Sequence, residues 1–178
     1  MPPDVTPEEF QIITGLDSLV CRSDILPEIQ RLAAKLFEQL QKKPTAAFVR
    51  TELPLALYGQ ELPAGVRSSN IYVIRPLVSS GLERHPNSHQ RSMSLNGSGA
   101  FELGLAEAKQ VYPISGLVSG LVSGLVVGQV VGHAGAAPAS RWVSIPPATW
   151  HQAIAGSEPW TVVTFHSAPD QDIINERM

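Results

Sequence analysis

The sequence has little cysteine and little charge. Cys21 is the single cysteine among 178 residues, which excludes an intrachain disulfide framework and any zinc site built on cysteine ligands. Charged residues make up 16% of the chain and the net charge is −3, so electrostatics gives no reason to expect nucleic acid or a membrane surface as a partner. The first residues lack a basic region followed by an apolar run, the pattern of a secretory signal, and we expect a cytoplasmic protein.

Several common catalytic motifs are also missing. The sequence has no G-x-S-x-G nucleophile motif, no phosphate-binding Gly-Lys-Ser/Thr loop, and no G-x-G-x-x-G fingerprint behind a strand. Gly97-Ser98-Gly99 has the composition of a hairpin turn. The length and the apolar fraction of 43% are those of a single globular domain that buries its own core.

Residues 1–45 are predicted to form an N-terminal helical extension. Thr6 has the place of an N-cap, with Pro7 at the first helical position and Glu9 at the third, which is the capping-box arrangement. This first helix is expected to be short and to end near Leu16.

A second, longer helix is predicted to follow a cap at Ser23-Asp24. Its apolar residues recur every three or four positions from Ile25 to Leu40, which indicates one buried stripe. Lys42-Lys43-Pro44 should end it, because the cations suit the negative end of a helix and proline cannot continue it. We expect the two helices to cover the rest of the fold, and a homodimer contact is the alternative use of the stripe.

Residues 46–178 have the pattern of a β domain. Short runs of β-branched and aromatic residues alternate with Gly, Pro and Ser, which indicates a sandwich or small barrel. The polar tail from Pro169 to Met178 is expected to add one helical turn. The clearest strand candidates are residues 47–50, 71–74, 91–95, 101–103, 142–145 and 161–165.

Residues 115–132 form a glycine-rich, apolar insertion. Glycine recurs at every fourth position from Gly116 to Gly132. The stretch is long enough to span a bilayer, and its small-residue spacing suits helix packing in a membrane or contact with a partner. The lack of a basic flank and an aromatic belt, and the cost of glycine in a helix, argue against a membrane span. We therefore expect a hairpin or packed loop at one rim of a barrel.

Two short segments supply a candidate metal site. Glu83 and His85 are two residues apart, so on a strand they share one face. A turn follows them, and Gln90 lies on the returning strand. His151 comes after a second turn that begins at Pro146-Pro147. Two imidazoles, a carboxylate and an amide oxygen can converge on one divalent metal, so these four residues are the predicted ligands. The sequence identifies no separate catalytic acid or base.

The other histidines are predicted to lie outside this site. His89 would face outward on a regular strand, although the preceding turn leaves the inward orientation open. His133 and His166 are expected to be structural or exposed. A buried carboxylate without a partner is costly, so an inward-facing Glu83 needs a metal ion or another cation beside it. A buried polar cluster without metal is the alternative.

The spacing of the first segment resembles the first of two paired motifs of the cupin superfamily. The family pattern is His-x-His, four residues, Glu, six residues, Gly. This sequence has Glu83-x-His85, four residues, Gln90, six residues, Gly97. The spacing is kept while two of the ligand types change, and some cupins use glutamine at the place of Gln90.

The second segment resembles the second cupin motif, Pro-x-Gly-x-x-His-x-x-x-Asn. This chain has Pro146-x-Ala148-x-x-His151-x-x-x-Ala155, which keeps the proline and the histidine. The family also has a glycine six residues before the first landmark of each motif. Those two places are occupied here by Leu77 and Ser140.

The resemblance covers about residues 46–166 and implies a mainly β fold, a double-stranded β-helix or cupin-type jelly-roll barrel with the metal inside. It implies a metal-dependent enzyme acting on a small organic substrate, with iron as the metal and manganese, nickel or zinc as alternatives. Two histidines and one carboxylate are the ligand set of non-haem Fe(II) oxygenases, which favours a dioxygenase-type oxidoreductase. A metal-dependent isomerase or lyase is one alternative, and a non-enzymatic cupin that binds a small ligand for sensing or storage is another.

Overall fold

The computed structural model describes residues 5–105, 108–117 and 140–178. Within these residues two helices come first and short strands follow. The elements are α1 (Pro7–Val20), α2 (Leu26–Gln41), β1 (Phe48–Glu52), η1 (Leu55–Tyr58), β2 (Ser68–Ile74), β3 (Glu83–Arg84), β4 (Gln90–Asn96), β5 (Ser98–Leu103), β6 (Gln110–Ser115), β7 (Trp142–Ile145), β8 (His151–Ala155), β9 (Trp160–His166), η4 (Asp170–Asp172) and β10 (Glu176–Arg177).

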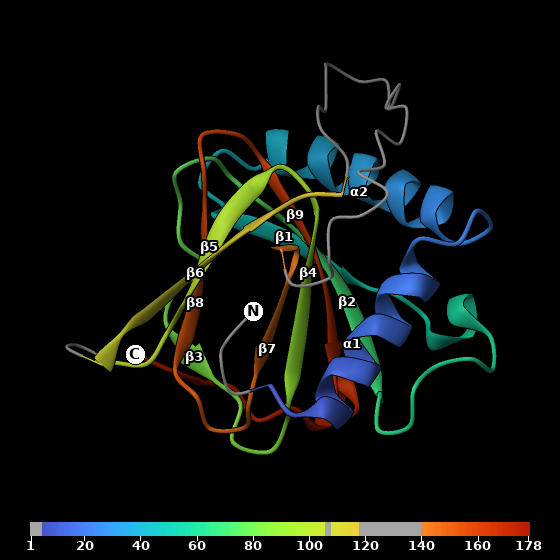
Figure 1. The fold of residues 1–178 in the computed structure, drawn as a ribbon. Coiled ribbons are helices and arrows are strands. Elements are labelled where there is room, and N and C mark those ends of the chain that lie inside the picture. Colours follow the sequence, from blue (N-terminus) through green and yellow to red (C-terminus); the bar gives the residue numbers. More distant parts are fainter. Residues whose placement is uncertain (1–4, 106–107, 118–139) are drawn as a thin grey trace.

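The strands form two five-stranded antiparallel sheets that face each other (Figure 1). One sheet has the order β1-β2-β9-β4-β7 and the other has the order β10-β3-β8-β5-β6. Chain segments far apart in the sequence are therefore neighbours, as β2 and β4 both pair with β9. This arrangement confirms the predicted mainly β fold of two packed sheets, and both helices lie on the outer side of the first sheet (Figure 1).

The first sheet is buried on both faces, which explains why β4 and β9 have no exposed residue. Alternate side chains such as Val163 and Phe165 face the helices and join the core formed by α1 and α2. Their neighbours Trp160 and Val162 face the second sheet and join the core between the sheets. The barrel interior is thus apolar around Trp160. Another part of it contains buried polar side chains, among them His85, His151 and His166.

Helix α1 begins as predicted but runs further. The Glu9 amide donates to Thr6 Oγ1 at 3.2 Å, so Thr6 is the N-cap. The side chain of Glu9 does not complete a capping box, because it binds Arg91 on β4 instead. The expected end near Leu16 is wrong: the helix continues to Val20, since Val20 extends the buried stripe against the sheet.

Helix α2 ends as predicted but begins differently. Its N-cap is Ile25, which makes no side-chain capping bond. The expected cap at Ser23-Asp24 is wrong, because Asp24 forms an ion pair with Arg22 at 2.7 Å. The helix ends at Gln41, directly before the lysines.

All six predicted strand runs coincide with strands of the structure. Strand β6 was not expected, and neither was β10 at the end of the polar tail. The tail does contain the expected helical turn, as the 3-10 turn Asp170–Asp172, but β10 follows it.

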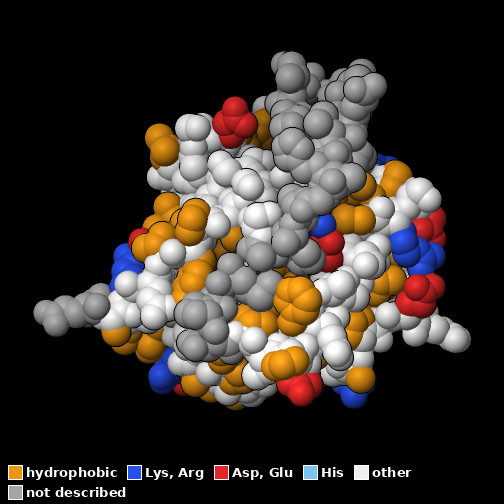
Figure 2. Space-filling model, viewed as in Figure 1, with side chains coloured by type: hydrophobic (Ala, Val, Ile, Leu, Met, Phe, Trp, Pro, Cys, Tyr) orange, Lys and Arg blue, Asp and Glu red, His pale blue; other side chains and the backbone are white. Residues whose placement is uncertain are grey.

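Most of the glycine-rich insertion lies outside the described residues, which include only 115–117 of it, and His133 lies outside them too. Gly116 donates its amide to the Gly97 carbonyl at 2.7 Å. No helix in the described part of the chain is long and apolar enough to cross a membrane. On the face seen in Figure 2, acidic and basic side chains are dispersed among hydrophobic ones.

Candidate metal centre

Strand pairing brings three of the four predicted ligands together. Glu83 on β3 lies directly opposite His151 on β8, and cross-strand partners of this kind have neighbouring side chains. His85 follows two residues after Glu83, on the same face. One ligand atom from each of the three residues lies within 4.8 Å of the other two.

The two imidazoles have nitrogen atoms that lack a partner. His85 and His151 are buried, with 5% and 2% of their surface exposed. Nδ1 of His151 lies 2.9 Å from the Thr149 carbonyl oxygen, so it carries the proton and donates there. Nε2 of His151 and Nδ1 of His85 have no hydrogen-bond partner among the described residues. A buried lone pair of this kind is suited to a metal ion.

Burial keeps His151 neutral. Burial and, to a smaller extent, the neighbouring His85 together lower the pKa of His151 to about 4, against the opposing effect of the hydrogen bond to Thr149. Burial likewise lowers the pKa of His166 to about 3, helped by the two other imidazoles. Metals bind the neutral form of histidine, so both rings are in a ligating state at neutral pH.

His166 is the residue of this cluster that the sequence reasoning missed. It was expected to be structural or exposed; the exposed alternative is wrong, because only 3% of His166 is exposed, and its ring meets that of His85 edge-on, with centroids 5.3 Å apart. On β9 it lies opposite Gln90, which turns both side chains into the barrel. The alternation of Val162, Thr164 and His166 along one face was the signal available in the sequence.

Gln90 faces the same interior as the three clustered residues. With Glu83 and His151 it lines a cavity of about 30 Å³, which has room for one water molecule or ion. Its amide nitrogen donates to Ser92 Oγ at 2.9 Å, which leaves the amide oxygen as the atom that could bind a metal.

His89 lies outside the cluster, on the opposite face of the sheet. Its Nε2 is 2.7 Å from Ser144 Oγ and 3.4 Å from Glu9 Oε1, beneath helix α1. Arg91 shares this outer face but is not solvent-exposed: α1 covers it, and its side chain is only 7% exposed beside Glu9.

Glu83 has a cation beside it. Nη2 of Arg177 on β10 lies 3.3 Å from Glu83 Oε2. Arg84 points to the other side of β3, where it lies over the Trp150 ring at 4.8 Å and pairs with Glu176. Adjacent residues of a strand point to opposite faces, so Glu83 faces the candidate centre while Arg84 forms its ion pair with Glu176 on the outer face.

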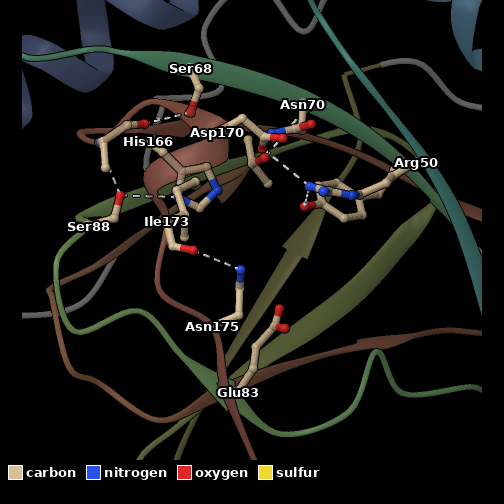
Figure 3. A network of polar contacts seen from close by, with 12 residues as sticks. Arg50, Ser68, Asn70, Glu83, Ser88, His166, Asp170, Ile173 and Asn175 are labelled. Carbon is tan, nitrogen blue, oxygen red and sulfur yellow. Dashed lines mark hydrogen bonds and ion pairs between the residues drawn. The ribbon is translucent and has the colours of Figure 1, made fainter.

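A polar cavity of about 370 Å³ opens beside Glu83 and His85. Figure 3 shows Glu83, His166, Asp170 and Arg50 around this space. Asp170 Oδ1 accepts from Asn70 Nδ2 at 2.9 Å, and it lies 3.3 Å from Arg50 Nη1. The volume suits a small organic molecule next to the candidate ligands.

The donor set fits a divalent transition metal. Two imidazoles and one carboxylate suit Fe, Mn, Ni or Zn, and the neutral oxygen of Gln90 is compatible as a further ligand. The Thr149 carbonyl accepts from Nδ1 of His151 and so fixes the tautomer in which Nε2 can bind a metal.

No protein-family model matches the sequence, and comparison with curated proteins gives no match. Among solved structures, an oxalate oxidase in complex with the substrate analogue glycolate matches with a TM-score of 0.49 and 14% identity, over 73% of this chain and 55% of the other. A Lactobacillus farciminis oxalate decarboxylase in a formate complex matches with a TM-score of 0.49 and 14% identity, over 74% and 31%.

Oxalate decarboxylase from Bacillus subtilis, which has Mn(II) centres, matches with a TM-score of 0.45 and 13% identity, over 64% of this chain and 24% of the other. The aligned region is therefore about half or less of each of these proteins. At this identity the likeness concerns the fold alone. In that sense the chain is similar in structure to the oxalate oxidase and oxalate decarboxylase cupins.

Proposed function

We propose that the chain is a metal-dependent enzyme that binds one divalent ion through Glu83, His85 and His151, with Gln90 as a further ligand. The observation that carries this proposal is the pair of buried imidazole nitrogens without a hydrogen-bond partner in the described part of the chain. Leaving buried polar atoms unpaired is costly, and a metal ion removes that cost. The nearby carboxylate supplies the charge that a divalent ion needs.

We propose further that the metal is iron and the reaction an oxygen-dependent oxidation of a small organic substrate. Two histidines and a carboxylate leave positions open for substrate and O₂ in non-haem Fe(II) oxygenases. When bound, such a metal supplies Lewis acidity and, as iron, activation of O₂. The chain supplies an oriented His151, an apolar wall that limits water on one side, and a cavity of about 370 Å³ for the substrate on the other.

Elemental analysis of the purified protein tests the metal proposal. We expect about one metal ion per chain in the wild type and its loss in Glu83→Ala and His151→Ala. His89→Ala is the matched control, because it removes an imidazole from the same region but outside the cluster, and it should retain the metal. Circular dichroism verifies that each variant is folded. Equal metal content in all four proteins, or none in the wild type after reconstitution with Fe(II), Mn(II), Ni(II) and Zn(II), refutes the proposed centre.

Oxygen consumption distinguishes the proposed reaction class from its alternatives. The Fe(II)-loaded protein is incubated with a panel of small organic acids, alcohols and phenols in an oxygen electrode. Uptake of O₂ that requires both substrate and the intact ligands supports an oxidation. Conversion of a substrate without O₂ uptake indicates the isomerase or lyase alternative, and saturable binding without conversion indicates a ligand-binding protein.

A further inference from the structure

The contact between Arg177 and Glu83 has no role in the proposed ligand set. Antiparallel pairing of β10 with β3 places Arg177 directly opposite Glu83. Nη2 of Arg177 lies 3.3 Å from Glu83 Oε2, while 66% of the Arg177 side chain is exposed. An exposed guanidinium thus pairs with the carboxylate proposed to ligate the metal.

The cavity beside Glu83 has more basic than acidic side chains. Lys43, Arg50 and Arg177 line it together with Glu83 and Asp170, so its net charge is +1 without counting histidines. A divalent ion on Glu83 would raise that charge from +1 to +3. A concave site with such a surplus attracts small anions.

Arg50 lies on another wall of the cavity, and its side-chain contacts within the described residues are long. Its Nη1 lies 3.3 Å from Asp170 Oδ1 and 3.4 Å from Tyr72 Oη. Asp170 is shared with the shorter bond from Asn70 at 2.9 Å. Figure 3 shows Arg50 directed toward the same space as Glu83.

We infer that the substrate is a small carboxylate anion and that Arg177 changes partner when the metal binds. Arg177 pairs with Glu83 until a metal ion takes that carboxylate, and its guanidinium then binds the carboxylate of the substrate. The inference rests on the proposed function, since it requires a metal at Glu83. Repulsion between a divalent ion and a guanidinium at one carboxylate drives the exchange, and the planar fork of arginine matches a carboxylate.

Metal affinity is the first test. The affinity of the apoprotein for Mn(II), a spectroscopic stand-in with similar ligand preferences, is measured from the electron paramagnetic resonance signal of free Mn(II). Arg177→Ala should bind Mn(II) up to about fivefold more tightly than the wild type, because an exposed competing ion pair is worth no more than that. Arg84→Ala is the control: it also removes an ion pair between β3 and β10, but one that does not touch Glu83.

Anion affinity is the second test, made on the Mn(II)-loaded proteins. Broadening of the acetate methyl signal in proton NMR reports binding near the metal, and acetamide is a neutral probe of the same size. Wild type and Arg84→Ala should bind acetate alike and in preference to acetamide. Arg177→Ala should bind acetate about fivefold more weakly, with acetamide unchanged.

Opposite effects of Arg177→Ala on the two affinities are the signature of the exchange. Weaker Mn(II) binding in Arg177→Ala means that Arg177 only supports Glu83, and overturns the inference. Equal effects of Arg177→Ala and Arg84→Ala also overturn the inference, because they indicate that both arginines only hold β10 against β3. Unchanged acetate affinity in Arg177→Ala overturns it as well. Failure of the wild type to bind Mn(II) or any other divalent ion overturns the proposed function itself, and is thereby distinguished from failure of the exchange alone.

Discussion

Removal of the Glu9 carboxylate should destabilise the fold by about 3 kcal/mol. Both Glu9 oxygens accept bonds from Arg91, from Nε and Nη2 at 2.7 Å each, and the side chains are only 11% and 7% exposed. Ser144 Oγ donates to Glu9 Oε1 at 2.7 Å as well. Glu9→Ala leaves the guanidinium buried without its counter-ion, a change that costs about 3–5 kcal/mol. A cavity of about 550 Å³ beside Glu9 admits water, so we place the loss at the lower end of that range.

The exposed pair between Glu28 and Arg31 on α2 provides the comparison. It has the same 2.7 Å separation, but its side chains are 50% and 53% exposed. Glu28→Ala should therefore cost less than about 0.5 kcal/mol. Urea unfolding at pH 7, followed by far-UV circular dichroism, gives both free energies of unfolding. Similar losses for Glu9→Ala and Glu28→Ala would refute the reasoning, because burial would then have no effect on the pair.

The pH dependence gives an independent check on Glu9. Burial raises the pKa of its carboxyl group, but the hydrogen bonds from Arg91 and Ser144 and the charge of Arg91 outweigh burial and leave the pKa lowered. A lowered folded pKa means that this stability is present above the ordinary pKa of glutamate and is lost as the pH falls through the folded value. Glu9→Gln should remove that part of the acid sensitivity, while Glu28→Gln should not.

Two other predictions concern stability. The folded pKa values of His151 and His166 lie at about 4 and about 3, below the ordinary value of 6.5, so the stability is full above pH 6.5 and falls as the pH approaches 4. His166→Phe should flatten this decline in the free energy of unfolding, measured by urea unfolding between pH 7 and 4.5. An unchanged slope would contradict the assignment. Leu77 and Ala148 have φ of 59° and 61°, so Leu77→Gly and Ala148→Gly should each stabilise by about 0.5 kcal/mol, visible as a higher melting temperature. Leu77→Ala keeps the Cβ and should give no such gain.

Local patterns predicted the strands and the neighbouring ligands well. Glu83 and His85 share a face because strand alternation is a property of the chain itself. The convergence of Glu83 and His151 was predicted from their ligand types and supported by the resemblance, but no local pattern fixes which strands pair. The register of β3 with β8 supplies the physical reason for it.

Contacts between distant elements could not be predicted from the sequence. The capping box at Glu9 failed because an arginine 82 residues away offers two charge-assisted bonds, which outcompete one bond to a helix terminus. His166 was missed for a similar reason: its position opposite Gln90 depends on the pairing of β9 with β4. In both cases the decisive partner is set by tertiary packing rather than by neighbours in the chain.

The places where the sequence differs from the cupin motifs that it resembles concern side chains of the candidate site as well as one turn. Ala148 replaces a glycine, yet it keeps a left-handed φ, and its amide donates to the His85 carbonyl at 3.0 Å, which holds the turn against the motif. Compared with the motif that the sequence resembles, the carboxylate stands at Glu83, and an amide stands at Gln90. The number of carboxylates is the same, but the charge now lies on β3, within reach of Arg177. At the place of Gln90 a carboxylate would face His166 on the neighbouring strand instead. The exchange proposed for Arg177 is therefore a consequence of where the carboxylate lies, and not of how many ligands the site contains.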